Sequence, residues 1–359
     1  MNRLLAYIIC SISAFTALAQ TYNNYIAVGV TPGYLLAHRA DIKHLAAHNF
    51  GVETSFEREV GYKDWASFYN KPTVGLGLLY YNLGREETGH AIGALFTTKF
   101  IIGNVGNSLL NFRMGAGLSY LSKRFDVYTN KRNQAIGSNL NGSMQFAMLM
   151  HSPLSVNNSS YLEYGLSISH YSNAAFKMPN LGYNIPSFSI RYGIGVQQNS
   201  FAHEAPKEDV NLWKLNTFLL FGKKERGFAD PQTFHHVGLQ VRGIKQVNMV
   251  KAWRFGVDGL LDKTYRFSED PTFPLDSIRF MDKLELGISG GYQWSIGNVD
   301  VLAELGAYVY KPAVLKNPLL QRVGLVYNVN ENLNVQGALR FHRGVADFFE
   351  MGIGYTLDL

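Results

Sequence analysis

The feature that most constrains this chain is a two-residue alternation of apolar residues with small or polar ones. In SFSIRYGIGVQ (187–197), serine, arginine, glycine and glutamine separate five apolar positions, which are Phe188, Ile190, Tyr192, Ile194 and Val196. Successive side chains of a β-strand point to opposite faces, so the pattern predicts a strand with one apolar and one polar face.

Comparable segments recur along the whole chain. They lie at residues 25–36, 49–57, 73–82, 91–102, 107–121, 140–151, 159–170, 187–197, 211–222, 234–245, 252–262, 283–294, 299–310, 320–329, 333–342 and 349–359. Segments of about ten alternating residues separated by turns are typical of outer-membrane barrels, which favour an even number of strands. The sequence therefore predicts an all-β fold, a transmembrane antiparallel β-barrel of about 16 strands, with a range of roughly 14–16.

Two other all-β architectures are compatible with the alternation. A soluble sandwich also alternates, but glycine and serine dominate the second face here, and the last strand has Tyr355, Leu357 and Leu359 on one side, which favours a membrane barrel. The polar segment 197–211 divides the chain in two, so tandem eight-strand barrels are an alternative. We expect one barrel instead, because a single closed barrel leaves fewer strand edges to protect.

The N-terminus indicates export. A basic start at Arg3, the apolar stretch LLAYIICSISAFTALA and an A-x-A site ending at Ala19 predict a cleaved signal peptide over residues 1–19. The only cysteine, Cys10, lies inside it, which excludes disulfides and cysteine-ligated metals from the mature chain. After residue 20 no run of 18 apolar residues occurs, so we expect no membrane-spanning helix. No nucleic-acid motif is present, and we infer no cofactor and no metal.

One strand ends in a pair of chemically active residues. In YLEYGLSISHYS (161–172), His170 and Ser172 continue the apolar parity of Leu166 and Ile168. Their Cα atoms are expected ~6.7 Å apart, facing lipid at the outer end of the strand. A serine beside a basic imidazole can attack an ester. The alternative is that both residues simply begin a polar loop above the apolar band.

The surrounding motif is more specific than the pair. HYSNAAFKMPNLGYN (170–184) resembles the signature of the outer-membrane lipid A 3-O-deacylase (acyloxyacyl hydrolase-like) family, His-x-Ser-Asn-Ala followed by Pro-Asn. The resemblance is specific over residues 161–192 and looser over 23–198. Residues 211–359 have no counterpart in the small eight-strand members, so their role is not indicated.

The resemblance implies roles for five residues. Ser172 would be the nucleophile and His170 the general base, while Asn173 and Asn180 match supporting asparagines, with Asn173 the preferred oxyanion donor. The family has a glutamate where this chain has Asn184. Asparagine can hold the histidine tautomer but cannot stabilise an imidazolium by charge, so a lower rate is expected. Glu86 and Glu87, on an outer connector, are candidate replacements for the missing acid.

These observations predict a hydrolase of the bacterial outer membrane. The mature chain, residues 20–359, would form the barrel, with deacylase-like strands and the catalytic motif over 20–198 and additional strands over 211–359. Its substrate would be lipid A of lipopolysaccharide, from which it removes an ester-linked acyl chain at the 3-position. The alternative is a catalytically inactive barrel that serves as a channel or binding protein, including an adhesive one with long outer loops. Inward charges such as Lys283, Asp300 and Glu304 are expected to pair inside the lumen, and lining a channel is their alternative role. The sequence does not indicate an oligomeric state.

Overall fold

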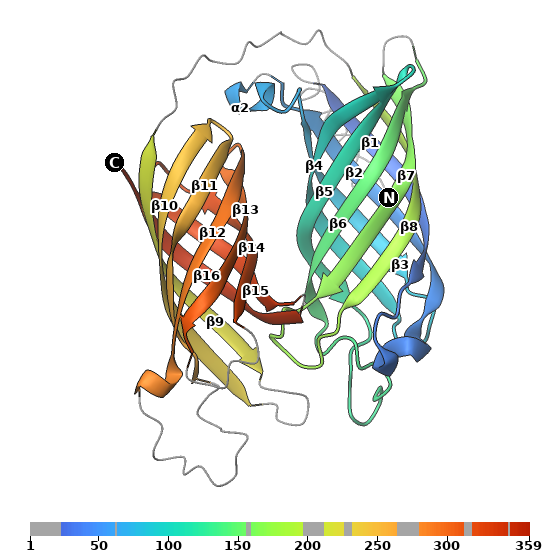
Figure 1. Ribbon diagram of the computed structural model, residues 1–359. Helices are drawn as coiled ribbons and strands as arrows, with labels where there is room; N and C mark the ends of the chain where they lie inside the picture. Colours follow the sequence, from blue (N-terminus) through green and yellow to red (C-terminus); the bar gives the residue numbers. More distant parts are fainter. Residues whose placement is uncertain are drawn as a thin grey trace, which may run out of the picture. The chain divides into compact units, whose positions relative to one another are not determined.

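The strands form two separate barrels. The computed structural model describes residues 23–61, 63–155, 159–196, 212–225, 232–263, 280–311, 318–343 and 345–359. These ranges contain sixteen strands in two closed antiparallel barrels of eight strands each (Figure 1). No helix in the described ranges has the length and apolar character that a membrane span requires. The predicted signal peptide (1–19) and the polar segment 197–211 lie outside the described residues.

The first barrel contains eight strands joined in chain order. They are β1 (Asn24–Leu35), β2 (Ala47–Glu59), β3 (Thr73–Asn82), β4 (His90–Val105), β5 (Ser108–Leu121), β6 (Leu140–Pro153), β7 (Ser160–Ser172) and β8 (Tyr183–Val196). Each strand pairs with the next, and β8 pairs back with β1 to close the sheet. The connectors include the short helices η1 (Ala40–Leu45) and α2 (Asp64–Ser67).

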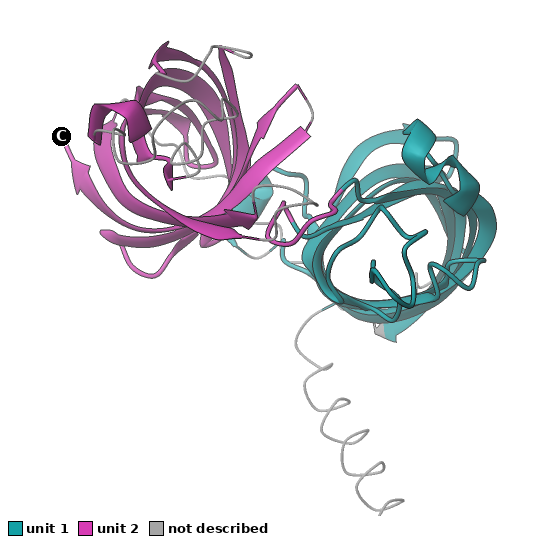
Figure 2. Ribbon diagram, turned by 90° about the horizontal axis from the view of Figure 1, so that it is seen from below, with its two compact units in different colours: residues 1–173, 181–205 teal, residues 174–180, 206–359 magenta. Residues whose placement is uncertain are grey.

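The second barrel repeats this topology. Its strands are β9 (Trp213–Glu225), β10 (Thr233–Asn248), β11 (Lys251–Leu261), β12 (Leu284–Ile296), β13 (Val299–Tyr310), β14 (Leu319–Asn328), β15 (Leu333–His342) and β16 (Val345–Asp358), with η4 (Phe280–Lys283) before β12. Strand β16 pairs with β9 to close it. By internal contacts the chain divides into residues 1–173 with 181–205, and residues 174–180 with 206–359 (Figure 2).

The predicted single 16-strand barrel over residues 20–359 is therefore wrong, and the alternative of tandem eight-strand barrels is the arrangement observed. The expected strand number is confirmed. Exposed strand edges do not separate the two arrangements, because an eight-strand barrel also pairs every strand on both sides. Alternation specifies the two faces of each strand, but it does not specify which strand pairs back with the first one to close the sheet.

Apolar side chains cover the outside of each barrel and polar ones fill the inside. Along β8, Phe188, Ile190 and Tyr192 are exposed, while Ser189 and Arg191 between them are buried. An outward apolar band with a polar interior is the pattern of a barrel in lipid. The interior of a barrel of eight strands is just wide enough for side chains to fill.

A buried ion network fills the lumen of the first barrel. Arg191 from β8 pairs with three carboxylates, those of Glu53, Glu57 and Glu163. Lys99 Nζ lies 2.8 Å from Glu57 and 2.6 Å from Glu163, and Arg113 Nη1 lies 2.6 Å from Glu53. Three carboxylates and three cations thus balance one another away from water.

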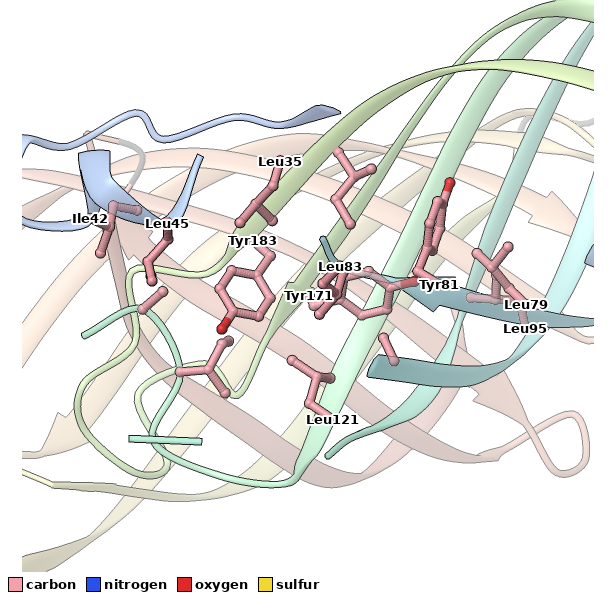
Figure 3. Close-up of a cluster of buried hydrophobic side chains, with 14 residues drawn as sticks. Leu35, Ile42, Leu45, Leu79, Tyr81, Leu83, Leu95, Leu121, Tyr171 and Tyr183 are labelled. Carbon is pink, nitrogen blue, oxygen red and sulfur yellow. The ribbon is translucent and has the colours of Figure 1, made fainter. Parts of the chain in front are cut away.

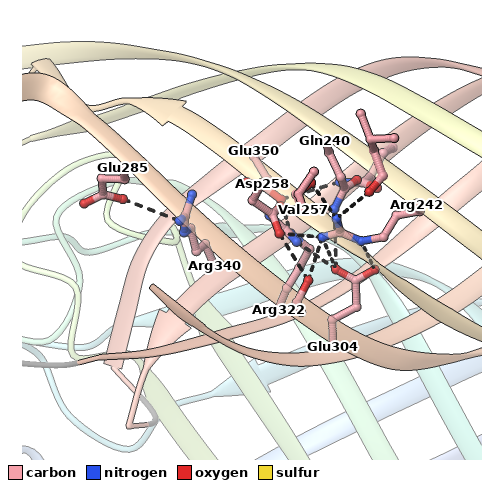
Figure 4. Close-up of polar contacts among 12 residues, drawn as sticks. Gln240, Arg242, Val257, Asp258, Glu285, Glu304, Arg322, Arg340 and Glu350 are labelled. Atoms are coloured by element: carbon pink, nitrogen blue, oxygen red, sulfur yellow. Dashed lines mark hydrogen bonds and ion pairs between the residues drawn. The ribbon is translucent and has the colours of Figure 1, made fainter. Parts of the chain in front are cut away.

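The second barrel has a similar network of its own (Figure 4). Arg242 and Arg322 both pair with Asp258 and Glu304, and Arg254 pairs with Glu304. The described residues leave a polar cavity of about 240 Å³ at one end, lined by Lys214, Asn216, Arg254 and their neighbours. The channel interpretation depended on a wide, water-filled barrel, and these two narrow barrels have buried charges across their lumens.

We predict that Arg191→Leu lowers the free energy of unfolding by about 3–5 kcal/mol, because it leaves buried carboxylates without their shared cation. The matched control is Arg132→Leu, which removes a largely exposed arginine that is 3.1 Å from Glu87 and should change stability by about 1 kcal/mol or less. Urea unfolding in detergent micelles, followed by gel mobility, measures both. Equal losses in the two variants would contradict a stabilising role for the network.

Candidate active site

His170 and Asn184 lie directly opposite each other on neighbouring strands. The β7–β8 register pairs His170 with Asn184, beside the connector 173–182 that joins the two strands. Leu166 and Ile168 of β7 are exposed on the outer face, and His170 and Ser172 continue that face as half-buried residues. The structure therefore brings His170 and Asn184 together and places Ser172 two residues beyond His170 on the same face.

A hydrogen bond joins the two opposed side chains. His170 Nδ1 lies 2.7 Å from Asn184 Oδ1. An amide oxygen can only accept, so the imidazole carries its proton on Nδ1 and leaves Nε2 free to accept one. In this tautomer His170 can act as a base toward a hydroxyl near Nε2.

A glycine packs against the imidazole ring. Gly182 has a φ of +77°, and a Cβ built on it would lie 2.9 Å from His170 Cε1 and 3.5 Å from Nε2. The position therefore requires glycine for two reasons, namely the left-handed backbone and the lack of space beside the ring. Gly182 was not among the residues predicted from the sequence, although a glycine in a connector between two predicted strands is a signal for a special backbone conformation.

Inward-pointing neighbours anchor the strand ends that carry the site. Tyr171, Tyr183 and Ile185 alternate with the outward residues and belong to a buried apolar cluster inside the barrel (Figure 3). The cluster also contains Leu35, Leu79, Tyr81 and Leu121 from other strands, together with Ile42 and Leu45 of η1. The Tyr183 hydroxyl donates to Asn133 Oδ1 at 2.8 Å. Packing of this kind fixes the backbone from which a functional side chain projects.

The two supporting asparagines occupy different environments. Asn173 is 8 % exposed, and its Nδ2 donates to Ser138 Oγ at 2.8 Å. The β5–β6 connector thus orients the amide of the residue next to Ser172. Asn180 is half-buried in the β7–β8 connector, two residues before Gly182. Ala174 and Ala175 adopt positive φ angles of 54° and 62°, so the chain turns sharply after Asn173.

A second histidine, missed in the sequence, contacts Asn184. Asn184 Nδ2 lies 3.1 Å from His38 Nδ1, in the connector between β1 and β2. No spacing pattern links residues 146 positions apart, and only the closing of the barrel brings them together. Glu87, a candidate replacement for the family glutamate, does not fill that role in the structure. It pairs with Arg132, and the hydrogen-bonding position at His170 Nδ1 is occupied by Asn184.

The second barrel has a histidine at the end of its own seventh strand but no matching serine. β15 ends at His342, and the residue two positions later is Gly344. His342 Nε2 lies 3.3 Å from Asp347, and Nδ1 lies 2.8 Å from the Leu319 carbonyl oxygen. The Ser–His arrangement of β7 is thus not repeated at this position.

Comparisons with solved structures give weak similarities. The crystal structure of the outer membrane enzyme PagL matches with 19% identity, over 47% of this chain and 99% of that one, at a TM-score of 0.33. OccK3 (OpdO) of Pseudomonas aeruginosa matches with 9% identity over 94% and 95%, at 0.23. CdiB from Acinetobacter baumannii matches with 8% identity over 94% and 60%, at 0.19. TM-scores this low do not establish a shared function. No curated protein matches the chain.

Comparison with protein-family models is more informative. Residues 48–193, within the first barrel, match lipid A 3-O-deacylase (PagL). Residues 213–359, the second barrel, match acyloxyacyl hydrolase, C-terminal domain. Between them the two models cover seven strands of the first barrel and all eight of the second, and they confirm the resemblance inferred from the motif at residues 170–184. The first barrel thus matches the lipid A 3-O-deacylase family over residues 48–193, and the members of that family are carboxylic ester hydrolases.

Proposed function

We propose that this protein removes the acyl chain esterified at the 3-position of lipid A in the outer membrane, by acyl transfer through Ser172 and His170. The observation that carries the proposal is the 2.7 Å hydrogen bond from His170 Nδ1 to Asn184 Oδ1, on the lipid-facing side of the strand that carries Ser172. It gives the imidazole the tautomer that a general base requires.

In the proposed reaction the Ser172 hydroxyl oxygen attacks the ester carbonyl carbon, and its proton passes to His170 Nε2. Collapse of the tetrahedral intermediate breaks the bond to the sugar oxygen, which takes the proton from His170 and leaves as the free 3-hydroxyl. Water then attacks the acyl-serine, again with His170 as base, and releases the fatty acid. Asn173, next to Ser172 and oriented by Ser138, is our candidate oxyanion donor, with Asn180 in a supporting role.

The surroundings of the pair suit a lipid substrate. Exposed apolar side chains lie below it on three adjacent strands: Phe146 on β6, Ile168 on β7 and Phe188 on β8. An acyl chain lying along the barrel wall would contact these residues while its ester reaches Ser172. The long connectors at this end of the barrel, such as residues 122–139, support a location at the outer leaflet.

The alternative, an inactive barrel that serves as a channel or binding protein, has less support. Buried ion pairs cross both lumens, which opposes conduction. The Ser–His pair would also serve no purpose in such a barrel. The substitution of the family glutamate by Asn184 is the strongest argument for inactivity, and it is directly testable.

We expect mass spectrometry of lipid A from an outer membrane that contains the protein to show loss of one hydroxyacyl chain, and no loss with Ser172→Ala. Asn184→Glu should raise the rate, because a carboxylate stabilises the imidazolium that forms during attack. Unchanged lipid A with both the wild-type protein and Asn184→Glu, each folded and surface-located, would refute the proposal. Activity in Asn184→Glu alone would identify an enzyme that has lost its acid.

We also predict that Gly182→Ala lowers kcat at least about tenfold, because the added Cβ displaces the His170 ring from Ser172. The control is Gly106→Ala, which also has a positive φ, of 59°, but has no atom within 4 Å of the added Cβ. It carries the same backbone strain without the contact. Deacylation rates on purified lipid A in detergent compare the two. A loss of equal size in the control would mean that strain, and not the imidazole position, causes the effect.

A further inference from the structure

We propose that His38 is a positioning residue of the reaction, which holds the Asn184 amide with its oxygen toward His170. This inference rests on the proposed function and adds a residue to its machinery. Its basis is a continuous chain of contacts, in which His170 Nδ1 lies 2.7 Å from Asn184 Oδ1 and Asn184 Nδ2 lies 3.1 Å from His38 Nδ1.

The need for such a residue follows from the chemistry of a carboxamide. A carboxylate offers two equivalent oxygens, so either one can accept from the histidine. The ends of an amide differ, although they have nearly the same shape. With Oδ1 toward His170, the imidazole keeps its proton on Nδ1 and Nε2 can take the serine proton. With Nδ2 toward His170, Nδ1 must accept, the proton moves to Nε2, and the base is lost.

His38 favours the productive orientation because of what its Nδ1 accepts. The Asn184 NH₂ group can only donate, so His38 Nδ1 must be unprotonated in this contact. A reversed amide would place the Asn184 oxygen against that lone pair. The reversed amide is tolerated only if a proton moves to His38 Nδ1, which can then donate to the Asn184 oxygen. As long as His38 keeps its proton on Nε2, the amide is held in the orientation that activates His170.

The fold brings His38 to this place through the closing seam of the first barrel. Strands β1 and β8 pair as far as Gly33 and Ser187, and Leu36 N then donates to the Asn184 carbonyl oxygen at 2.8 Å. Leu35 is buried in the apolar cluster, 2 % exposed. The backbone on both sides of the contact is thus fixed, and His38 follows two residues after Leu36 with an exposed side chain.

The test is a set of His38 variants in two backgrounds, wild type and Asn184→Asp. In the wild-type background we expect His38→Gln, which keeps an acceptor, to retain kcat within about threefold. His38→Ala should lower kcat about tenfold. His38→Lys, which can only donate, should lower it further by attracting Oδ1 away from His170. KM should change little in all three. His48→Ala is the control, an exposed histidine of β2 at the same end of the barrel, which packs against Tyr34.

In the Asn184→Asp background the His38 variants should have nearly equal kcat values. A carboxylate needs no orienting, so His38→Ala should change kcat less than about threefold, and His38→Lys should be no worse because its ammonium pairs with the aspartate. Equal losses in both backgrounds would overturn the proposal and indicate a merely structural role. The same conclusion follows if His38→Ala behaves like His48→Ala.

A spectroscopic measurement separates this inference from the proposed function. In the protein labelled with ¹⁵N-histidine in detergent micelles, the imidazole shifts of His170 report which nitrogen carries the proton, whether or not lipid A is turned over. We expect Nδ1–H in the wild type and a shift toward Nε2–H in His38→Lys. Unchanged His170 shifts in His38→Lys would refute the positioning role. Turnover that survives Ser172→Ala would instead refute the mechanism while leaving the tautomer result intact.

Discussion

Closure of the sheet is the constraint on which the rest of the first barrel depends. In a hydrocarbon environment no water satisfies the backbone N–H and C=O groups, so every strand must be paired on both sides. β8 meets this requirement by pairing with β1, from Val196 opposite Asn24 to Ser187 opposite Gly33. The same seam continues to the contact of Leu36 with Asn184. Closure therefore also assembles the candidate site, because it brings the connector after β1, with His38, beside Asn184 of β8.

The lumen makes a closed barrel of this size rigid. Eight strands leave an interior that side chains can fill, and here they fill it with opposite charges. Each buried charge is unfavourable alone and acceptable only when its partners are in place, so the network tolerates one arrangement of the strands. Arg191 demonstrates this, since it joins carboxylates from β2 and β7 to β8. Farther along the same strands, toward the connector 173–182, apolar residues such as Tyr171 and Tyr183 fill the lumen and hold the strand ends that carry His170 and Asn184.

The parts of this structure that could be predicted from sequence are the local ones. Alternation indicated the position of each strand and its outer face, and the fourteen-residue spacing of His170 and Asn184 is a hairpin register. The pairing partner of the eighth strand is not local, and alternation contains no information about it. For the same reason the sequence predicted one barrel instead of two, and it did not reveal His38, which lies 146 residues before Asn184. Gly182 is an intermediate case. The sequence shows a glycine in the connector, but it does not show that this glycine packs against the His170 ring.

The asparagine at position 184 can be understood from the location of the site. In the proposed reaction, a carboxylate at this position would lie beside the acyl chain of the substrate, where a charge is unfavourable unless it is paired, as it would be with a protonated His170. The pair of Asn184 and His38 is neutral in the observed contact, so it orients His170 without placing a charge beside the acyl chain. Under the proposed mechanism it lacks the electrostatic stabilisation that a carboxylate would give to the imidazolium formed during attack. We therefore expect the neutral pair to give a lower rate but to avoid a charge beside lipid. Asn184 can orient His170 in this way only if its amide is held with the oxygen toward His170, and we propose that His38 holds it there.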